Sequence, residues 1–196
     1  MKHIVTDMGG VMIELYWEYY AAKMLEKEYS IEELQKLWVT SEATKNFETG
    51  KISLDEFADK IIEEFKVKLT PEEIKKNFCA ITGPPKPKFK EVFTELKKHF
   101  TLSVLSNTNP PHVECLRQKY DLFALFDRLF FSYEIGLMKP FPEIFEYVIK
   151  KLNCKPSDIL FFDDSRINVE AAKRLGINAF VVTSPQDIYD ISSKFI

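Results

Sequence analysis

Short apolar runs alternate with amphipathic stretches along the second half of the chain, from about residue 86 onward. Four of the runs have the length and composition of buried strands, and they lie at Leu102–Leu105, Arg128–Phe131, Ile159–Phe162 and Ala179–Val182. Stretches with helical spacing lie before and between them, at Phe89–His99, His112–Lys119, Pro142–Leu152 and Asn168–Leu175. Such alternation predicts a parallel sheet with helices on both faces. Ile4 and Val5 at the start of the chain add a fifth, short strand.

The segment from residue 14 to residue 85 has a different pattern, without a convincing strand. Ser30 with Glu33 and Ser53 with Glu56 have the spacing of a capping box, and Thr70-Pro71-Glu72-Glu73 is a third helix start. Gly83-Pro84-Pro85 closes the segment with residues that break helices. We therefore predict a small helical cap at 14–85, inserted after the first strand of an α/β core made of residues 1–13 and 86–196.

Length and composition describe an ordinary globular chain. The 196 residues are enough for one core with a small appendage, and 45% of them are hydrophobic against 29% charged. The net charge is −3, and the densest basic group is Lys86, Lys88, Lys90, Lys97 and Lys98. That group fits a solvated helix face better than a nucleic-acid surface, so no nucleic-acid partner is predicted.

The expected compartment is the cytoplasm. No apolar run approaches the roughly 20 residues that span a bilayer, and the N-terminus lacks the long apolar region of a secretory signal. Cys79, Cys115 and Cys154 have no metal or redox spacing, which is typical of free thiols in a reducing compartment. The three histidines lie far apart and offer no obvious catalytic imidazole. No feature indicates an oligomeric state.

Polar residues follow the predicted strands at their carboxyl ends, where ligands of open parallel sheets bind. Asp7 follows the first strand and precedes two glycines, and Ser106-Asn107 follows the second. Lys139 lies in a loop stiffened by the next residue, a proline. Each residue alone has an ordinary explanation, because aspartate and serine cap turns and most lysines are at the surface. Their recurrence at successive strand ends is what indicates a site.

The strongest local signal is Asp163-Asp164, directly after four apolar residues of the fourth predicted strand. Two crowded carboxylates raise each other's pKa unless a cation neutralises them. Carboxylate oxygens suit Mg²⁺, which takes few protein ligands and keeps several waters. The sequence therefore predicts a magnesium site, with a paired turn as the simpler alternative.

The order Asp7, Ser106, Lys139, Asp163-Asp164 resembles the four motifs of the haloacid dehalogenase-like superfamily, over essentially the whole chain. The resemblance implies a Rossmann-like three-layer core with a helical cap. It is nearest to sugar-phosphate phosphatases that have glycine two residues after the nucleophile.

The same resemblance implies roles for individual residues. Asp7 is the nucleophile that forms an aspartyl-phosphate. Lys139 and Ser106, with the Asn107 amide region, hold the phosphoryl oxygens. Mg²⁺ is held by Asp7, the Gly9 carbonyl and Asp164, with Asp163 direct or through water. The implied partner is a small phosphorylated metabolite, such as a sugar phosphate.

One position departs from the family pattern. Most family phosphatases have a second aspartate, the general acid and base, where this chain has Gly9. General acid–base catalysis contributes ~10²–10⁴-fold, on the order of 3–5 kcal/mol of barrier. Either the leaving group needs little protonation, or another residue such as Glu14 or a cap group replaces the aspartate, or the chemistry is different or lost.

Two other functions stay open on the sequence alone. A metal-independent 2-haloacid dehalogenase also lacks the second aspartate, but it leaves Asp163-Asp164 unexplained. A non-catalytic domain that binds a phosphorylated ligand or a partner is the other alternative. Substrate specificity is expected in the cap, where an early aromatic group either lines the pocket or packs between helices: Tyr16, Trp17, Tyr19 and Tyr20.

Overall fold

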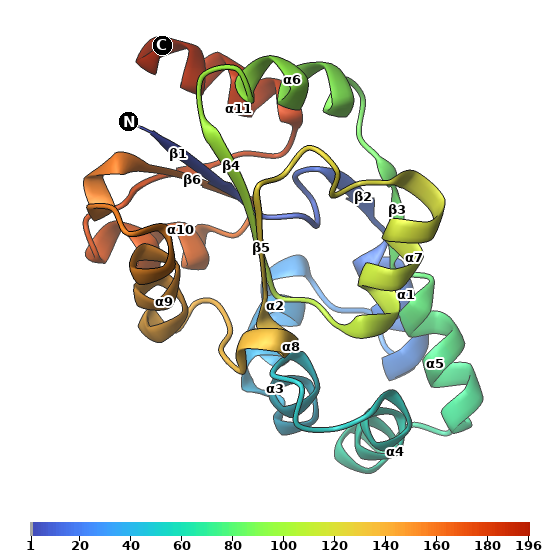
Figure 1. Cartoon of the computed structure of the whole chain (residues 1–196). Coiled ribbons are helices and arrows are strands. Elements are labelled where there is room, and N and C mark those ends of the chain that lie inside the picture. The colour runs from blue at the N-terminus through green and yellow to red at the C-terminus, as the bar shows by residue number, and fades with distance from the viewer. Residues whose placement is uncertain (1) are drawn as a thin grey trace.

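A five-stranded parallel sheet forms the centre of the molecule, in the order β5-β4-β1-β6-β7 (Figure 1). The computed structural model describes residues 2–196. The strands are β1 (His3–Thr6), β4 (Thr101–Ser106), β5 (Arg128–Phe131), β6 (Ile159–Asp163) and β7 (Asn178–Val181). Each of the five predicted strands is present, and the predicted α/β class is confirmed.

Helices cover both faces of the sheet because successive residues of a strand point to opposite sides. Ile4 packs into a cluster with α6 (Phe89–Leu96), α7 (Pro110–Tyr120) and α11 (Pro185–Ser192). Val5 packs into a second cluster with α9 (Pro142–Leu152) and α10 (Arg166–Arg174). Three short elements complete this part: α8 (Ser132–Ile135), η1 (Pro156–Asp158) and η2 (Ser193–Phe195).

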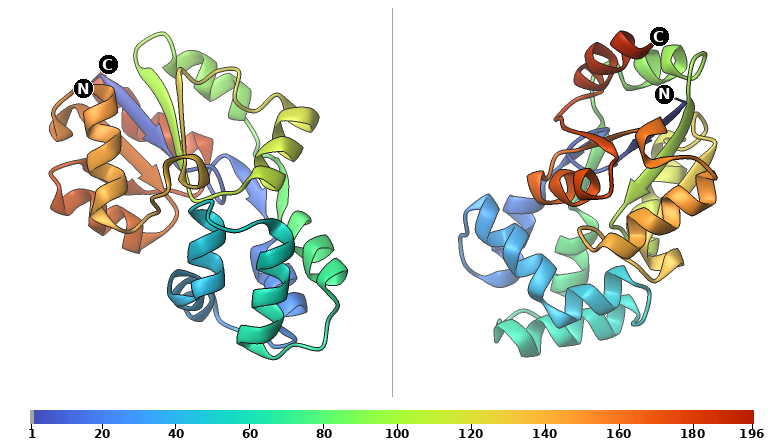
Figure 2. Two further views of the ribbon diagram at one scale, coloured as in Figure 1. Left: turned by 60° about the horizontal axis from the view of Figure 1, so that its bottom comes forward. Right: turned by 90° about the vertical axis from the view of Figure 1, so that its left-hand side faces the viewer.

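Five helices between the first strand and the rest of the sheet gather at one end of the molecule (Figure 2). They are α1 (Trp17–Leu25), α2 (Ile31–Thr40), α3 (Glu42–Glu48), α4 (Leu54–Phe65) and α5 (Pro71–Cys79). They have their own apolar cluster, in which the rings of Phe47 and Phe78 lie 4.6 Å and 5.0 Å from that of Phe57. Ser30, Ser53 and Thr70 each begin a helix with a complete capping box.

A short antiparallel ribbon connects these helices to the sheet and differs from the expectation of no strand in this segment. It pairs β2 (Ile13–Leu15) with β3 (Thr82–Pro85). Two prolines are tolerated because the ribbon has only two strands and needs few donors. Gly83 is required, since a Cβ there would lie 2.8 Å from Glu14 Cβ. The division into 1–13 with 86–196 and 14–85 stays a prediction, and both junctions fall in or beside this ribbon.

Within residues 2–196, no helix has the length and apolar character needed to cross a membrane.

Candidate active site

The carboxyl ends of β1, β4 and β6 meet at one edge of the sheet. From β1 the chain passes first to β4 and β5 on one side and later to β6 and β7 on the other. Ligands of open α/β sheets bind where the strand order reverses in this way. Asp7 and Asp163 lie on either side of that point, and Ser106 ends β4 beside it. A cavity of about 610 Å³ opens at the same edge.

Lys139 is the buried cation of this edge. Its side chain is 1% exposed, and Nζ lies 2.9 Å from Asp7 Oδ1 and 2.5 Å from Asp163 Oδ2. Burial opposes the charge, but the Asp163 and Asp7 carboxylates outweigh it and raise the pKa of the Lys139 ammonium. The lysine therefore stays charged, next to the predicted nucleophile.

Asn107 fixes the loop that presents Lys139. The Asn107 Nδ2 donates to the Lys139 carbonyl at 2.9 Å, and the Lys139 N–H donates to Asn107 Oδ1 at 2.8 Å. The nitrogen and the oxygen of the Asn107 side-chain amide thus both form hydrogen bonds with the backbone of Lys139. The side chain positions Lys139, so a direct contribution of Asn107 to phosphate binding falls to its backbone. Ser106 is 2% exposed and lines the cavity, and its role as a phosphate ligand stays a prediction.

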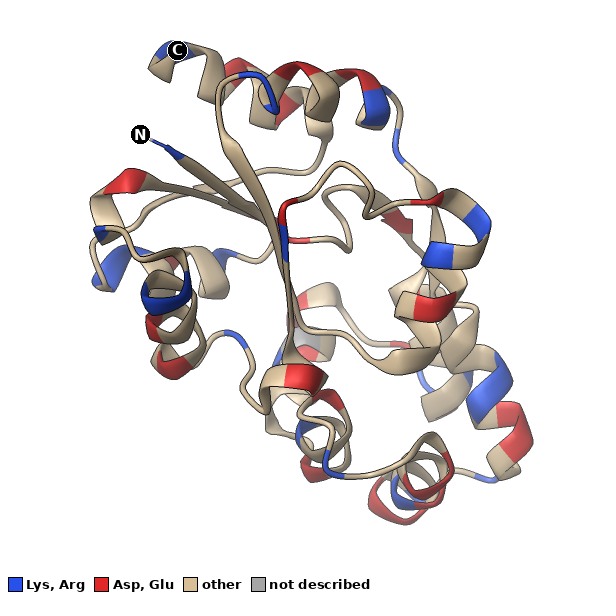
Figure 3. Cartoon of the chain, viewed as in Figure 1, with Lys and Arg blue, Asp and Glu red and all other residues tan. Residues whose placement is uncertain are grey.

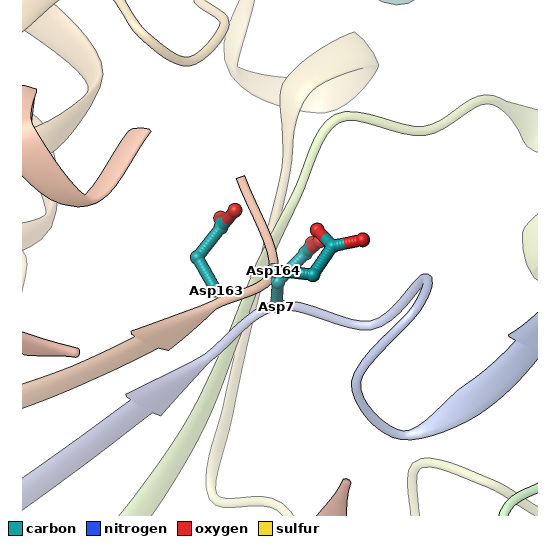
Figure 4. Close-up of side chains that lie close together, drawn as sticks. All are labelled: Asp7, Asp163 and Asp164. Carbon is teal, nitrogen blue, oxygen red and sulfur yellow. The ribbon is translucent and has the colours of Figure 1, made fainter. Parts of the chain in front are cut away.

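Three carboxylates converge at the strand ends (Figure 4). Asp7, Asp163 and Asp164 each offer an oxygen, and these atoms all lie within 4.8 Å of one another. Burial raises the pKa of Asp7 to about 6 although Lys139 lowers it, and burial with the charges of Asp7 and Asp163 raises the pKa of Asp164 to about 7. The cluster therefore carries more negative charge than Lys139 offsets, which is the condition that a divalent cation relieves.

The two adjacent aspartates are not equivalent. Asp163 is fully buried, and its oxygens accept hydrogen bonds from Ser165 N at 2.8 Å, Asn168 Nδ2 at 3.0 Å and Lys139 Nζ. Asp164 instead lines the cavity. It lies against Gly10, where a Cβ would be 2.1 Å from Asp164 Oδ2 and where φ is +69°. Glycine at position 10 is thus what leaves room for the Asp164 carboxylate.

Two residues of the cavity had no signal in the sequence. Glu48 ends α3 and is only 5% exposed, and its Oε1 accepts a hydrogen bond of 2.9 Å from Trp38 Nε1. His112 lies in the first turn of α7, with its Nε2 2.8 Å from the Phe78 carbonyl of α5 and its ring stacked on Phe78. Glutamate and histidine on helices are ordinary in a sequence, and only packing brings them to this edge.

The aromatic group of the cap does both of the things predicted as alternatives. Tyr16, Trp17 and Tyr19 line the cavity, with Tyr16 and Tyr19 exposed. Trp17 also packs edge-on against Trp38, and Tyr20 packs against the apolar cluster of the cap.

Away from the cavity, basic and acidic residues are interspersed on the outer helices (Figure 3).

Comparison with known proteins agrees with this geometry. The sequence pattern of haloacid dehalogenase-like hydrolases matches residues 1–176. The D-ribitol-5-phosphate phosphatase of Bacteroides thetaiotaomicron is 28% identical, over 92% of this chain and 91% of its own length. A phosphorylated carbohydrates phosphatase of Thermotoga maritima is 30% identical, over 90% of this chain and 82% of its own length. A crystal structure of a family enzyme from B. thetaiotaomicron, complexed with magnesium and inorganic phosphate, superposes with a TM-score of 0.74 at 26% identity, covering 92% of this chain and 93% of its own.

The chain belongs to the haloacid dehalogenase-like hydrolases. The family predicted from the four strand-end motifs is confirmed, and so is its assignment to the phosphatase-type enzymes.

Proposed function

We propose that this protein is a Mg²⁺-dependent phosphomonoesterase that hydrolyses a small phosphorylated metabolite through an aspartyl-phosphate. The observation that carries the proposal is the contact of Lys139 with Asp7 at 2.9 Å in a cavity that Asp164 also lines. One carboxylate is thereby kept ionised and accessible, while another stays free for a cation.

The residues present fit Mg²⁺. Asp7, Asp164 and the Gly9 carbonyl would hold it, all oxygen donors of the kind that this cation prefers. Asp163 has hydrogen bonds on both oxygens, which favours a contact through water over a direct one. Bound there, Mg²⁺ reduces the repulsion between the attacking carboxylate and the phosphate and polarises the phosphoryl group.

The side chains of this chain divide the remaining tasks. Asp7 attacks phosphorus and holds the phosphoryl group until water releases it. Lys139 keeps Asp7 ionised and presents its ammonium to the phosphoryl oxygens. Ser106, with backbone N–H groups that follow β4, holds those oxygens in place. Because Lys139 and Ser106 are almost fully buried, their geometry is fixed before substrate arrives.

The proposed substrate is a phosphorylated sugar or polyol. The relatives at 28% and 30% identity are named for ribitol-5-phosphate and for phosphorylated carbohydrates. A cavity of about 610 Å³ is in the range that holds a small ligand.

Steady-state release of phosphate from ribitol-5-phosphate and from p-nitrophenyl phosphate tests the proposal. We expect turnover with Mg²⁺ and its loss with EDTA. We also expect a loss of roughly 10³-fold or more in Asp7→Asn, as for other removed nucleophiles. Asp59→Asn, an exposed aspartate of α4, is the matched control and should keep full activity. Absence of turnover on a broad phosphate panel, or halide release from a 2-haloacid without metal, would refute it.

A further inference from the structure

Hydrolysis of an alkyl phosphate needs a proton donor that position 9 does not offer. Gly9 has no side chain, and a Cβ there would lie 3.3 Å from Leu15 Cδ2. Without a donor, the leaving oxygen departs as an alkoxide, which is unfavourable near neutral pH. Another side chain of the cavity must therefore supply the proton if alkyl phosphates are substrates.

Glu48 is the buried carboxyl group that the cap brings to this cavity. It lines the same cavity as Asp7, Lys139 and Ser106, and the charges of Lys139 and Asp7 act on it. Its Oε2 is buried and has no hydrogen-bond partner among residues 2–196. Buried carboxylate oxygens are normally satisfied, so an orphaned one at a cavity indicates a ligand group as its partner. The other two glutamates of the cavity, Glu14 and Glu18, are more exposed.

Trp38 decides which oxygen of Glu48 carries a proton. The indole Nε1–H is only a donor, so Oε1, at 2.9 Å from it, must accept. When Glu48 is protonated, its proton is therefore on Oε2, the oxygen without a partner. The Glu48 carboxyl group is thus held by one oxygen and free to exchange a proton with the other.

Resting on the proposed function, we propose that Glu48 of α3 is the general acid and base of the reaction, in place of a carboxylate at position 9. As the Asp7 oxygen bonds to phosphorus and the P–O bond to the leaving group breaks, the leaving oxygen takes the proton from Glu48 Oε2. Glu48 is then a carboxylate. In the second step it takes a proton from the water that attacks phosphorus, and the bond to Asp7 breaks. The products are the alcohol, inorganic phosphate, ionised Asp7 and protonated Glu48.

The environment of Glu48 suits both steps. Burial raises its pKa to about 7, against the hydrogen bond from Trp38 and the charge of Lys139. A group that is half protonated near neutral pH can give a proton in one step and accept one in the next. Because Glu48 belongs to the cap, protonation of the leaving group also requires the cap to be in place over the sheet edge.

The dependence of Glu48→Gln on the leaving group tests the inference. Glutamine keeps the size and the acceptor for Trp38 but cannot supply the proton. On ribitol-5-phosphate or glycerol phosphate, whose alkoxides need protonation, we expect kcat to fall by ~10²–10⁴-fold. On p-nitrophenyl phosphate, whose leaving group is stable as an anion, the fall should be about tenfold or less. Glu14→Gln is the matched variant and should show no such difference between substrates.

Two outcomes would overturn the role of Glu48: an equal loss on both substrates, or a leaving-group-dependent loss in Glu14→Gln instead. If Glu48→Gln fails to fold, the same two substrates are compared in Glu48→Asp. We then expect kcat to fall more on the alkyl phosphate than on p-nitrophenyl phosphate, by a smaller factor than in Glu48→Gln. A wild-type protein inactive on every phosphate ester would instead refute the proposed function, so the two failures are distinguishable.

Discussion

Lys139 shows how much a single residue of this site depends on its neighbours. A lysine ammonium that is 1% exposed is costly to bury unless it is paired, and here two carboxylates pair with it. With Asp164 nearby, the four charged groups of the edge carry more negative than positive charge. At the residue scale, this excess of negative charge favours the proposed cation, and the Lys139 ammonium favours the ionised form of Asp7, the proposed nucleophile.

His112 gives a prediction on pH at this scale. Burial lowers its pKa to about 4, below the ordinary 6.5, so the folded protein holds it neutral. In the unfolded chain, the His112 imidazole is protonated as the pH falls below about 6.5, whereas in the folded chain it is protonated only near pH 4. The stability that neutral His112 provides is therefore present above pH 6.5 and is lost as the pH falls toward 4. In His112→Gln this loss disappears.

We expect the difference in unfolding free energy between wild type and His112→Gln to shrink by about 2 kcal/mol from pH 7 to pH 5. Urea unfolding at several pH values measures it. Carboxylates that titrate in the same range act on both proteins and cancel in the difference. A difference that is constant with pH would contradict the assignment of a neutral, buried His112.

At the scale of elements, the backbone that follows α3 is in close contact with the backbone of α8. Gly50 has a φ of +70°, and a Cβ there would lie 2.3 Å from the Tyr133 carbonyl of α8. Glu48 lies two residues earlier, at the end of α3. The contact between these two backbones therefore sets the position of Glu48 relative to the strand ends.

Replacing Gly50 by alanine should lower the free energy of unfolding by about 1–3 kcal/mol, because backbone strain and a collision with Tyr133 O act together. Gly136→Ala is a close control. That glycine also has a positive φ, +77°, but its Cβ would meet nothing within 4 Å. Equal losses in the two variants, measured by chemical unfolding, would show that the contact between α3 and α8 is unimportant.

At the scale of the whole molecule, the α/β core and the helical cap each have apolar packing of their own, and the charged sheet edge lies between them. The sheet has a cluster on each face, and the five cap helices have a third of their own. The charged groups lie where the apolar packing stops, so the carboxylates can stay close together only if the surrounding fold holds them. The stability of the folded molecule is therefore linked to the binding of a cation by the carboxylates of this edge.

At the proposed site, Mg²⁺ should stabilise the fold, because the carboxylates lie together in the folded chain and are dispersed in the unfolded one. At a concentration of about 100 times Kd the gain is roughly 2.7 kcal/mol, which corresponds to a Tm increase of about 5–10 °C for a chain of this size. Thermal unfolding with Mg²⁺ or EDTA measures it. Asp164→Asn should abolish the increase and Asp59→Asn should keep it; an increase retained without Asp164 would place the cation elsewhere.

Much of this architecture was predictable from the sequence because it depends on local patterns. Alternating apolar runs and helical spacings predict the five strands, and side-chain capping predicts the start of α2, α4 and α5. The family motifs place Asp7, Ser106 and Asp164 at strand ends and Lys139 in the loop between α8 and α9, and the parallel order brings all four to one cavity. The β2–β3 ribbon was missed because a run of glycine and proline is typical of a breaker.

Long-range packing decided the rest. The sequence by itself determined the class of fold, the acidic edge and the absence of a carboxylate at position 9, because each is a property of neighbouring residues or of a repeated pattern. It did not determine that Asn107 holds the backbone of Lys139, that Asp163 meets Lys139 while Asp164 lies against Gly10, or that Glu48 reaches the cavity with a free oxygen. Those contacts join residues far apart in the chain, and only the packing of the cap helices and loops against the sheet edge brings them together.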